Sequence, residues 1–276
     1  GMSKNNRFTD EAVARGLAVL KEFGEIIRNS HSRYRAVATA ACRMAANGAE
    51  FVHRVKDECG VCLEVIDGVE EARLNMLGAL ANADKTKPYV LVYDIGGGST
   101  EVTLANRDTT EIIYTVSIPW GARNASEHFG INDYNPQSAQ AFEAEIVSYL
   151  QKFKEGCRYD NYAGQVSFVA TSSTPLRLSA YINQRAEYNR EAEDGSQMSK
   201  AQMDNAIAEI FKTTELERAA SRYVGEKRAP IFVSGCILLK TIYDNLQIPV
   251  LTASYKSAKD SIIMELIKEA NHGTSD

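Results

Sequence analysis

The sequence predicts an α/β protein of two lobes with mixed sheets. Short apolar runs rich in β-branched residues alternate with helical patterns along the whole chain, which is typical of α/β folds. The chain has 276 residues, of which 44% are hydrophobic and 24% charged, and this composition suits a globular protein of one or two domains. Three successive strands expected between residues 89 and 116 interrupt the alternation and predict a β-meander.

The first part of the chain is expected to alternate helices and strands. Thr9 precedes two acidic residues and an apolar stripe, so it predicts a helix cap. The stripe consists of Val13, Leu17, Leu20, Phe23 and Ile27. Residues 35–38 and 63–66 are expected to form strands, and Asn47 with Glu50 resembles the capping box of a helix between them. Gly60 is expected to end that helix.

Two glutamates open the next predicted helix. Glu70 and Glu71 lie in its first turn, where the helix dipole favours negative charge. The apolar residues that follow at helical spacing are Leu74, Leu77 and Leu80. A capping role alone would explain both glutamates.

The stretch of residues 89–104 has the composition of a phosphate-binding loop. Residues 90–93 are a short apolar run suited to a strand buried on both faces, and Asp94 stands where this strand ends. The residues that follow include three glycines and two hydroxyls, Gly96, Gly97, Gly98, Ser99 and Thr100. Glycines allow positive φ angles and let backbone amides approach a ligand closely, because no Cβ stands in the way.

The residues after the glycines exclude two families of phosphate loop. Dinucleotide-binding loops and Walker loops run directly into a helix, and the Walker loop also carries a lysine. Here residues 101–104 alternate polar and apolar side chains, residues 106–108 predict a turn, and residues 111–116 resume a β-branched run. A glycine-rich hairpin turn with no ligand stays open as the alternative.

The rest of the chain continues the alternation. The expected strands are residues 166–170, 231–233 and 249–253, and the expected helices are residues 119–129, 136–153, 237–243 and 258–270. Residues 171–174 predict a hydroxyl-rich loop before Pro175, the expected first helical residue, and this arrangement suits an anion. Residues 187–197 are expected to form an exposed loop, and Ser199 with Gln202 predicts a capping box.

The net charge and the cysteine content limit which binding partners and which kinds of site the sequence predicts. The net charge of −5 gives no general attraction for nucleic acid or anionic membranes. No apolar run approaches the ~18 residues of a membrane span, so we expect a cytoplasmic protein. Five cysteines are an odd number, which argues against a disulfide framework. Cys59 and Cys62 have the spacing of a redox pair or half a zinc site, but a structural turn explains them as well.

Three ordered motifs together are specific for one family. They are Val-Ala-Thr-Ala-Ala-Cys-Arg ending at Arg43, Ile-Asp-Gly-Val-Glu-Glu-Ala-Arg ending at Arg73, and Asp-Ile-Gly-Gly-Gly-Ser-Thr-Glu over residues 94–101. Weaker matches follow at residues 117–123 and 171–174. With these motifs the chain resembles the exopolyphosphatase and guanosine pentaphosphate phosphohydrolase (Ppx/GppA) family of the actin-like ATPase superfamily.

The resemblance implies two ribonuclease H-like domains with the site in the cleft between them. The first would span residues 1–88 and the second residues 89–257, and a C-terminal helix in residues 258–276 would pack back on the first. Family members begin with a further strand and a second phosphate loop of the type Asp-Ile-Gly-Ser-Asn-Ser. Because these do not precede the helix at Thr9, we expect a truncated N-terminal lobe.

The resemblance also implies a role for each matched residue. Glu71 would be the general base, Asp94 and Glu101 would hold Mg²⁺, and Arg43 would neutralise charge on the substrate. The phosphoryl oxygens would be bound by Gly96, Gly97, Gly98, Ser99, Thr100, Ser172 and Ser173. These residue types suit phosphoryl transfer, which needs positioning and charge neutralisation more than covalent catalysis.

The implied activity is release of terminal phosphate from inorganic polyphosphate or from guanosine penta- or tetraphosphate. A non-catalytic phosphate or nucleotide sensor, or an inactive fragment, stays open because the second phosphate loop is missing. An actin-like ATPase or sugar kinase would share the fold, but Glu-Glu-Ala-Arg before the glycines resembles the phosphatase branch. A truncated lobe would expose a sheet edge and an apolar face, so we expect a homodimer.

Overall fold

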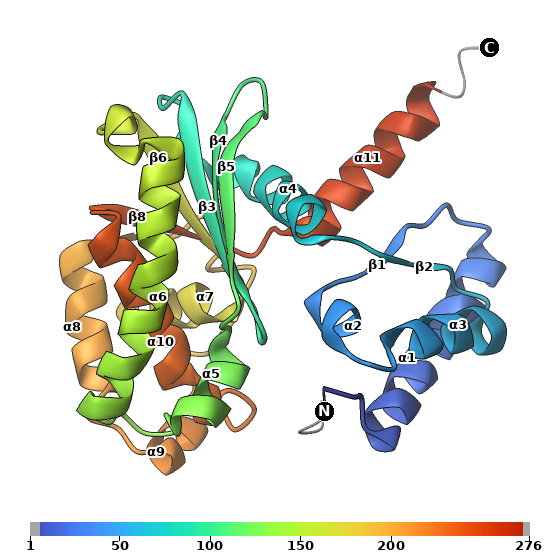
Figure 1. The fold of residues 1–276 in the computed structure, drawn as a ribbon, viewed down its shortest axis with the longest axis horizontal. Helices are drawn as coiled ribbons and strands as arrows, with labels where there is room; N and C mark the ends of the chain where they lie inside the picture. Colours follow the sequence, from blue (N-terminus) through green and yellow to red (C-terminus); the bar gives the residue numbers. More distant parts are fainter. Residues whose placement is uncertain (1–5, 273–276) are drawn as a thin grey trace. The chain divides into compact units, whose positions relative to one another are not determined.

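The computed structural model describes residues 6–272 and divides into two compact units (Figure 1). The first unit contains the chain up to Glu71 and the chain from Ser261 onward, and the second contains Ala72–Asp260. Two helices cross the division, α4 (Gly68–Ala79) and α11 (Ala258–His272). The family-based division at residues 88 and 257 stays a prediction.

The first unit is built from α1 (Asp10–Ser30), β1 (Ala36–Ala38), α2 (Ala40–Met44), α3 (Gly48–Cys59) and β2 (Leu63–Val65), with the ends of α4 and α11. Strands β1 and β2 pair in parallel. Thr9 caps α1 as predicted, since its hydroxyl accepts a hydrogen bond from the Ala12 amide at 3.2 Å. Gly60 ends α3 in the left-handed conformation, as predicted.

Two expectations for the first unit were wrong. Asn47 does not cap α3, because its side chain bonds the backbone N–H and C=O of Phe8 at 2.8 and 3.1 Å instead. Phe23 was expected on the packing face of α1, but it is 53% exposed. The core of this unit consists of Val13, Leu17, Val55, Cys59 and Val61. Within residues 6–272 none of the cysteines forms a disulfide, and Cys59 is a buried core residue.

Within the described chain, the second unit holds a six-stranded mixed sheet with the order β5-β4-β3-β6-β8-β7. The strands are β3 (Tyr89–Ile95), β4 (Thr100–Asn106), β5 (Ile112–Ile118), β6 (Val166–Thr171), β7 (Gln197–Ser199) and β8 (Val250–Ser254). The first three form the predicted antiparallel meander, and β6 and β8 continue the sheet from β3 in parallel. Strand β7 pairs antiparallel with β8 at the edge, in a region expected to be loop.

Helices cover both faces of this sheet. Besides α4, the helices of the second unit are α5 (Ala122–Phe129), α6 (Pro136–Cys157), α7 (Ser173–Ile182), α8 (Lys200–Ile210), α9 (Glu215–Ala220) and α10 (Ala229–Asn245). The unit also contains the 3-10 turns η1 (Leu80–Asn82) and η2 (Tyr159–Tyr162). Helices α6 and α10 pack against Leu91 and Tyr93 on one face. Helix α4 packs Met76 and Ala79 against Val90 and Val92 on the other. Among the described residues no helix is long and apolar enough to cross a membrane.

The strand expected at residues 231–233 was wrong, because these residues lie in α10. A short apolar run fits a buried strand or a buried helix equally well. Here the burial continues around the helix, and Ile231, Phe232 and Val233 are all buried. Pro175 is the third residue of α7 rather than the first, since the helix begins at Ser173. The capping box of Ser199 and Gln202 is confirmed.

Candidate active site

The glycine loop is the four-residue connection of the β3–β4 hairpin, and the Gly96 amide donates to the Ser99 carbonyl at 3.0 Å. None of its three glycines takes a positive φ angle, so that expectation was wrong, and the close approach of the loop amides to a ligand stays a prediction. A fourth glycine, Gly121, packs closely against the loop. A Cβ on Gly121, at the start of α5, would lie 2.5 Å from Gly96 O, Gly97 C and Gly98 N. The loop and Gly121 therefore touch backbone to backbone.

The first turn of α5 holds the loop by its carbonyl groups. The amides of Ala122 and Arg123 donate to the Gly96 and Gly97 carbonyls at 2.9 and 3.1 Å. The Asn124 side chain donates to the Gly98 carbonyl at 3.0 Å. In residues 6–272 the amides of Gly97 and Gly98 have no backbone acceptor, and a Cβ on Gly98 would meet nothing within 4 Å. The loop thus offers two amides without a backbone acceptor among the described residues, which suits an anionic ligand.

We expect Gly121→Ala to destabilise the second unit by about 1–3 kcal/mol or more, because its methyl group clashes with the loop backbone. Urea unfolding followed by circular dichroism measures this effect. Gly98→Ala is the matched control, since its methyl group enters open space at an ordinary φ angle and stability should stay within ~0.5 kcal/mol. If both substitutions were equally tolerated, the packing argument for Gly121 would be wrong.

A cavity of about 140 Å³ brings the glycine loop and the serine loop together. It is lined by Ile95, Gly96, Gly97, Ala122, Ser172, Ser173, Thr174, Arg228, Ile231 and Phe232. Ser172 has a φ of 79°, a strained region for a non-glycine residue, and its hydroxyl donates to the Ile95 carbonyl at 2.6 Å. Ser173 is the first residue of α7. Arg228 was missed from the sequence, because it lies far from every motif along the chain.

Thr100 and Ser99, both expected to bind phosphate, are buried in the second unit. The Thr100 hydroxyl is fully buried and donates to the Trp120 carbonyl at 2.8 Å, so this side chain holds the β3–β4 hairpin to the segment before α5. Ser99 is also buried, at 8% exposure. The Thr100 hydroxyl is therefore engaged within the protein, and the role of Ser99 as a phosphate ligand stays a prediction.

Asp94 and Glu101 stand directly opposite each other in the β3–β4 ladder. Glu101 is 3% exposed and accepts a hydrogen bond from the Ser117 hydroxyl at 3.0 Å. Asp94 accepts one from the Asn75 amide group at 2.8 Å. Two like charges directly opposite in a sheet repel each other, and a cation bound between them offsets this cost. On the other side of Asp94, the buried hydroxyl of Thr171 has no hydrogen-bond partner among the described residues.

These donors fit Mg²⁺, which commonly takes one or two carboxylates and completes its shell with substrate phosphates and water. Within residues 6–272 no group of three acidic, histidine or cysteine side chains is arranged to hold a metal ion by itself. Asp94 and Glu101 would therefore hold the ion only together with oxygens from substrate and solvent.

Asn75 orients Asp94 and was not predicted. Its amide group donates to Asp94, and its carbonyl oxygen accepts from the amide of Ala258, the first residue of α11, at 3.0 Å. We expect Asn75→Ala to weaken apparent Mg²⁺ affinity by ~10–100-fold, the usual effect of losing a group that orients a metal ligand. Mg²⁺ titration of thermal stability and of phosphate release measures it. Asn245→Ala, at the end of α10, is the control, and equal effects of the two substitutions would contradict the role of Asn75.

In the first unit, the structure brings Arg43 and Glu71 together. Arg43 Nη1 donates to Glu71 Oε2 at 2.9 Å and to the Ile66 carbonyl at 2.6 Å, and Glu71 is 8% exposed. The Asp67 carboxylate accepts from the Glu70 amide at 2.8 Å and supplies the cap at the start of α4. Capping therefore does not explain Glu71, whose carboxylate is engaged by Arg43.

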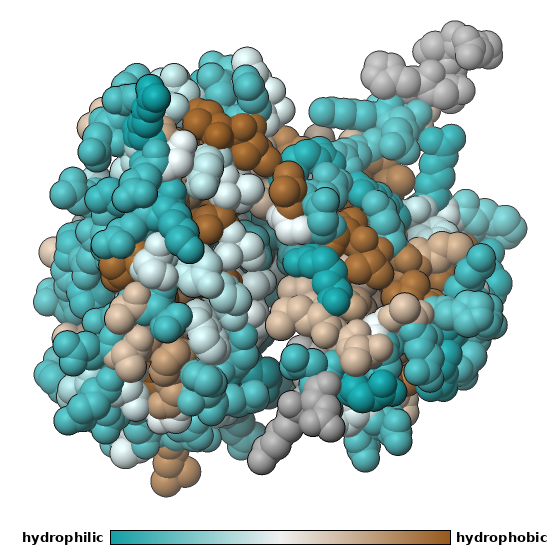
Figure 2. Space-filling view, viewed as in Figure 1, coloured by the Kyte–Doolittle hydropathy of each residue, from teal (hydrophilic) through white to brown (hydrophobic). Residues whose placement is uncertain are grey.

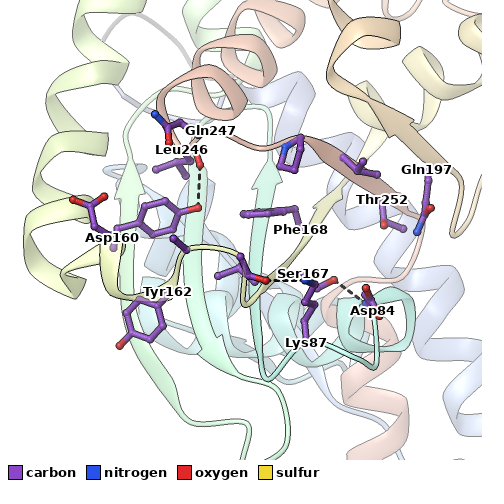
Figure 3. Close-up of a pocket in the computed structure, with 16 residues that line it drawn as sticks. Asp84, Lys87, Asp160, Tyr162, Ser167, Phe168, Gln197, Leu246, Gln247 and Thr252 are labelled. Carbon is purple, nitrogen blue, oxygen red and sulfur yellow. Dashed lines mark hydrogen bonds between the residues drawn. The ribbon is translucent and has the colours of Figure 1, made fainter.

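A larger cavity, of about 470 Å³, lies at the opposite ends of the parallel strands (Figure 3). Ser167 and Phe168 line it near the start of β6, and the Lys87 ammonium group next to it donates to the Gly164 carbonyl at 2.7 Å. No sequence motif falls there, and the glycine loop lies at the other end of the sheet. The smaller cavity is better suited to binding phosphate than the larger one, because loop glycines, the start of a helix and an arginine line it.

Comparison with known proteins identifies the family. A model of the Ppx/GppA phosphatase family matches residues 1–270. The chain belongs to this family. This Ppx/GppA protein is 27% identical over 276 residues to exopolyphosphatase 2 of Mycobacterium tuberculosis, covering 96% of the chain and 85% of that protein. It is 26% identical over 254 residues to a bifunctional 3-dehydroquinate synthase/phosphatase of Fusobacterium nucleatum, covering 88% of the chain but only 36% of that protein.

Solved structures agree on the fold of this Ppx/GppA protein. An exopolyphosphatase-like protein matches with a TM-score of 0.85 and 25% identity, over 97% of this chain and 88% of that one. The Aquifex aeolicus Ppx/GppA enzyme matches with a TM-score of 0.79 and 25% identity, over 94% and 84%. An exopolyphosphatase from Cytophaga hutchinsonii, at 23% identity and a TM-score of 0.85, supports the fold alone. The α/β actin-like fold of the family is thus confirmed, and the family supports a hydrolase.

Proposed function

We propose that this chain releases terminal phosphate from inorganic polyphosphate or from guanosine penta- or tetraphosphate with bound Mg²⁺. The observation that carries the proposal is the β3–β4 hairpin, which holds two facing carboxylates and two amides without a backbone acceptor among the described residues, all within eight residues. The family match and the exopolyphosphatase relative support the same class of reaction.

In this proposal each step of the reaction is assigned to particular residues. The Gly97 and Gly98 amides and Arg228 bind and orient the terminal phosphoryl oxygens. Glu71, oriented by its ion pair with Arg43, accepts a proton from the attacking water. Mg²⁺, when bound at Asp94 and Glu101, supplies neutralisation of the phosphate charge. The water attacks the terminal phosphorus, the bridging P–O bond breaks, and the shortened phosphate leaves with its own negative charge.

The test is phosphate release from polyphosphate and from guanosine pentaphosphate, with Mg²⁺ and with EDTA. We expect release with Mg²⁺ from at least one of the two and none with EDTA. If both substrates bound but neither released phosphate, the chain would be a phosphate or nucleotide sensor rather than a hydrolase.

We also propose that the chain forms a homodimer. Helix α1 exposes Val19, Phe23 and Ile26 by 49%, 53% and 60%, and Figure 2 shows apolar residues reaching the surface of the first unit. Contiguous apolar surface of this kind commonly marks an interface. Light scattering after size-exclusion chromatography should give twice the chain mass, and Phe23→Glu should lower it. A monomer at micromolar concentration would contradict the proposal.

A further inference from the structure

Thr171, the last residue of β6, lies beside Asp94 in the sheet. The parallel register of β3 and β6 pairs Asp94 with Thr171, and the antiparallel register of β3 and β4 pairs Asp94 with Glu101. Residues that pair directly across neighbouring strands point their side chains to the same face of the sheet. One row on this face therefore contains Glu101, Asp94 and Thr171, in this order.

Helix α4 covers the face of the sheet that carries this row. Val92, two residues before Asp94, and Val169, two residues before Thr171, lie in one apolar cluster with Met76 of α4. Side chains two residues apart along a strand share a face. Thr171 is fully buried there, so its hydroxyl cannot form hydrogen bonds with solvent.

The polar side chains on either side of Thr171 have partners. Asp94 accepts a hydrogen bond from the Asn75 amide group at 2.8 Å. Ser254, which pairs with Thr171 on the β8 side, accepts one from the Asn82 amide group at 2.9 Å. The Thr171 hydroxyl itself has no hydrogen-bond partner among the described residues. A buried hydroxyl without a partner is costly and rare in folded proteins, so this one calls for an explanation.

A purely structural role does not require this hydroxyl. Threonine is β-branched and suits a strand, but valine has the same shape and would avoid burying an unpaired hydroxyl. A carboxylate has about four lone-pair positions, so Asp94 can accept from Asn75, contact a cation and still accept from a neighbouring hydroxyl. A single side-chain torsion places the threonine hydroxyl, which can therefore turn toward Asp94 without backbone movement.

We propose that Thr171 is a positioning residue of the Mg²⁺ site, whose hydroxyl donates a hydrogen bond to the Asp94 carboxylate when the cation is bound. Asn75 then holds Asp94 from α4 and Thr171 holds it from β6, which leaves the side toward Glu101 for the cation. The proposal rests on the proposed function and adds to it a residue that orients a metal ligand.

Mg²⁺ titration of the unfolding temperature, with and without inorganic phosphate, tests this role without turnover. We expect Thr171→Val to raise the Mg²⁺ concentration at the midpoint by ~10-fold, the usual effect of losing a group that orients a metal ligand. Without Mg²⁺ its unfolding temperature should equal or exceed that of the unmodified chain, because an unpaired buried hydroxyl is removed. Thr171→Ser keeps the hydroxyl and should keep the midpoint of the unmodified chain.

Two further variants show whether the effect is specific and whether it passes through Asp94. Thr103→Val is the matched control, since Thr103 lies on β4 two residues after Glu101 and its buried hydroxyl is paired with that of Thr115 at 2.9 Å. It should leave the Mg²⁺ midpoint unchanged, whatever its effect on stability. Thr171→Val added to Asp94→Asn should shift the midpoint no further than Asp94→Asn alone, because the hydroxyl acts through this carboxylate.

Four results would overturn the role of Thr171. They are an unchanged Mg²⁺ midpoint in Thr171→Val, an equal shift in Thr103→Val, additive shifts in the double variant, and an unmodified chain whose unfolding temperature does not respond to Mg²⁺. The failure of the hydrolase proposal is a separate result, because the unmodified chain would then release no phosphate while its Mg²⁺ midpoint still depended on Thr171.

Discussion

Glu71→Gln is expected to lower kcat for phosphate release by about 10²–10⁴-fold, the usual contribution of a general base. Glutamine keeps the size of the side chain and still accepts a hydrogen bond from Arg43, but it cannot take a proton from water. KM for polyphosphate should change little, because Glu71 does not bind the phosphate chain. Steady-state phosphate release, together with a thermal unfolding curve, measures both expectations.

Glu70→Gln is the matched control for this experiment. Glu70 is the preceding residue in the same helical turn, and its carboxylate pairs with Arg35 at 3.0 Å instead of Arg43. Its replacement removes one partner of an ion-pair network and should leave kcat within about 2-fold. Equal rates for Glu71→Gln and the unmodified chain would rule out Glu71 as the base.

Asp94→Asn is expected to lower the rate of phosphate release by ~10²–10³-fold and to raise the Mg²⁺ concentration needed for half-maximal rate. The substitution removes one of the two facing carboxylates, and with it the negative charge that would hold the cation opposite Glu101. Mg²⁺ titrations of the rate, and of the unfolding temperature, measure the loss in two independent ways.

A matched control separates the loss of this carboxylate from a general effect of a substitution in the sheet. Asp84→Asn, just before β3 at the other end of the sheet, is the control, since the Asp84 carboxylate accepts from the Thr86 amide and hydroxyl within its own turn. A Mg²⁺ dependence that is the same in Asp94→Asn and Asp84→Asn would remove Asp94 from the metal site.

Local pattern predicted the β3–β4 hairpin well. The run of residues 90–93, the carboxylate after it and the alternation from Glu101 are all contained in one short segment, so tertiary structure had little to add. The expectation of positive φ angles in the loop was wrong, and the close packing of the loop depends on Gly121, which comes after two more strands. A local pattern does not show which distant residue will pack against the loop backbone.

The parts that could not be predicted depend on contacts between distant segments. Arg228 reaches the glycine loop only through the packing of α10, and α10 itself was split in the prediction because its buried apolar run has no polar face. Asn75 lies in an ordinary helical position, and only the structure shows that its two amide atoms join Asp94 to Ala258. No local pattern distinguishes such residues from neighbours that simply face solvent.

The pairing of Asp94 with Glu101 also limits how the family can vary. Four residues join the two strands, and side chains alternate between faces along each strand. If the connection keeps its four-residue turn, insertion or deletion of one residue at positions 96–99 would turn Glu101 to the opposite face of the sheet and separate the two carboxylates. Relatives that keep this reaction should therefore tolerate substitutions within the loop but keep its length constant. A relative whose loop is longer or shorter by an odd number of residues should have lost hydrolysis.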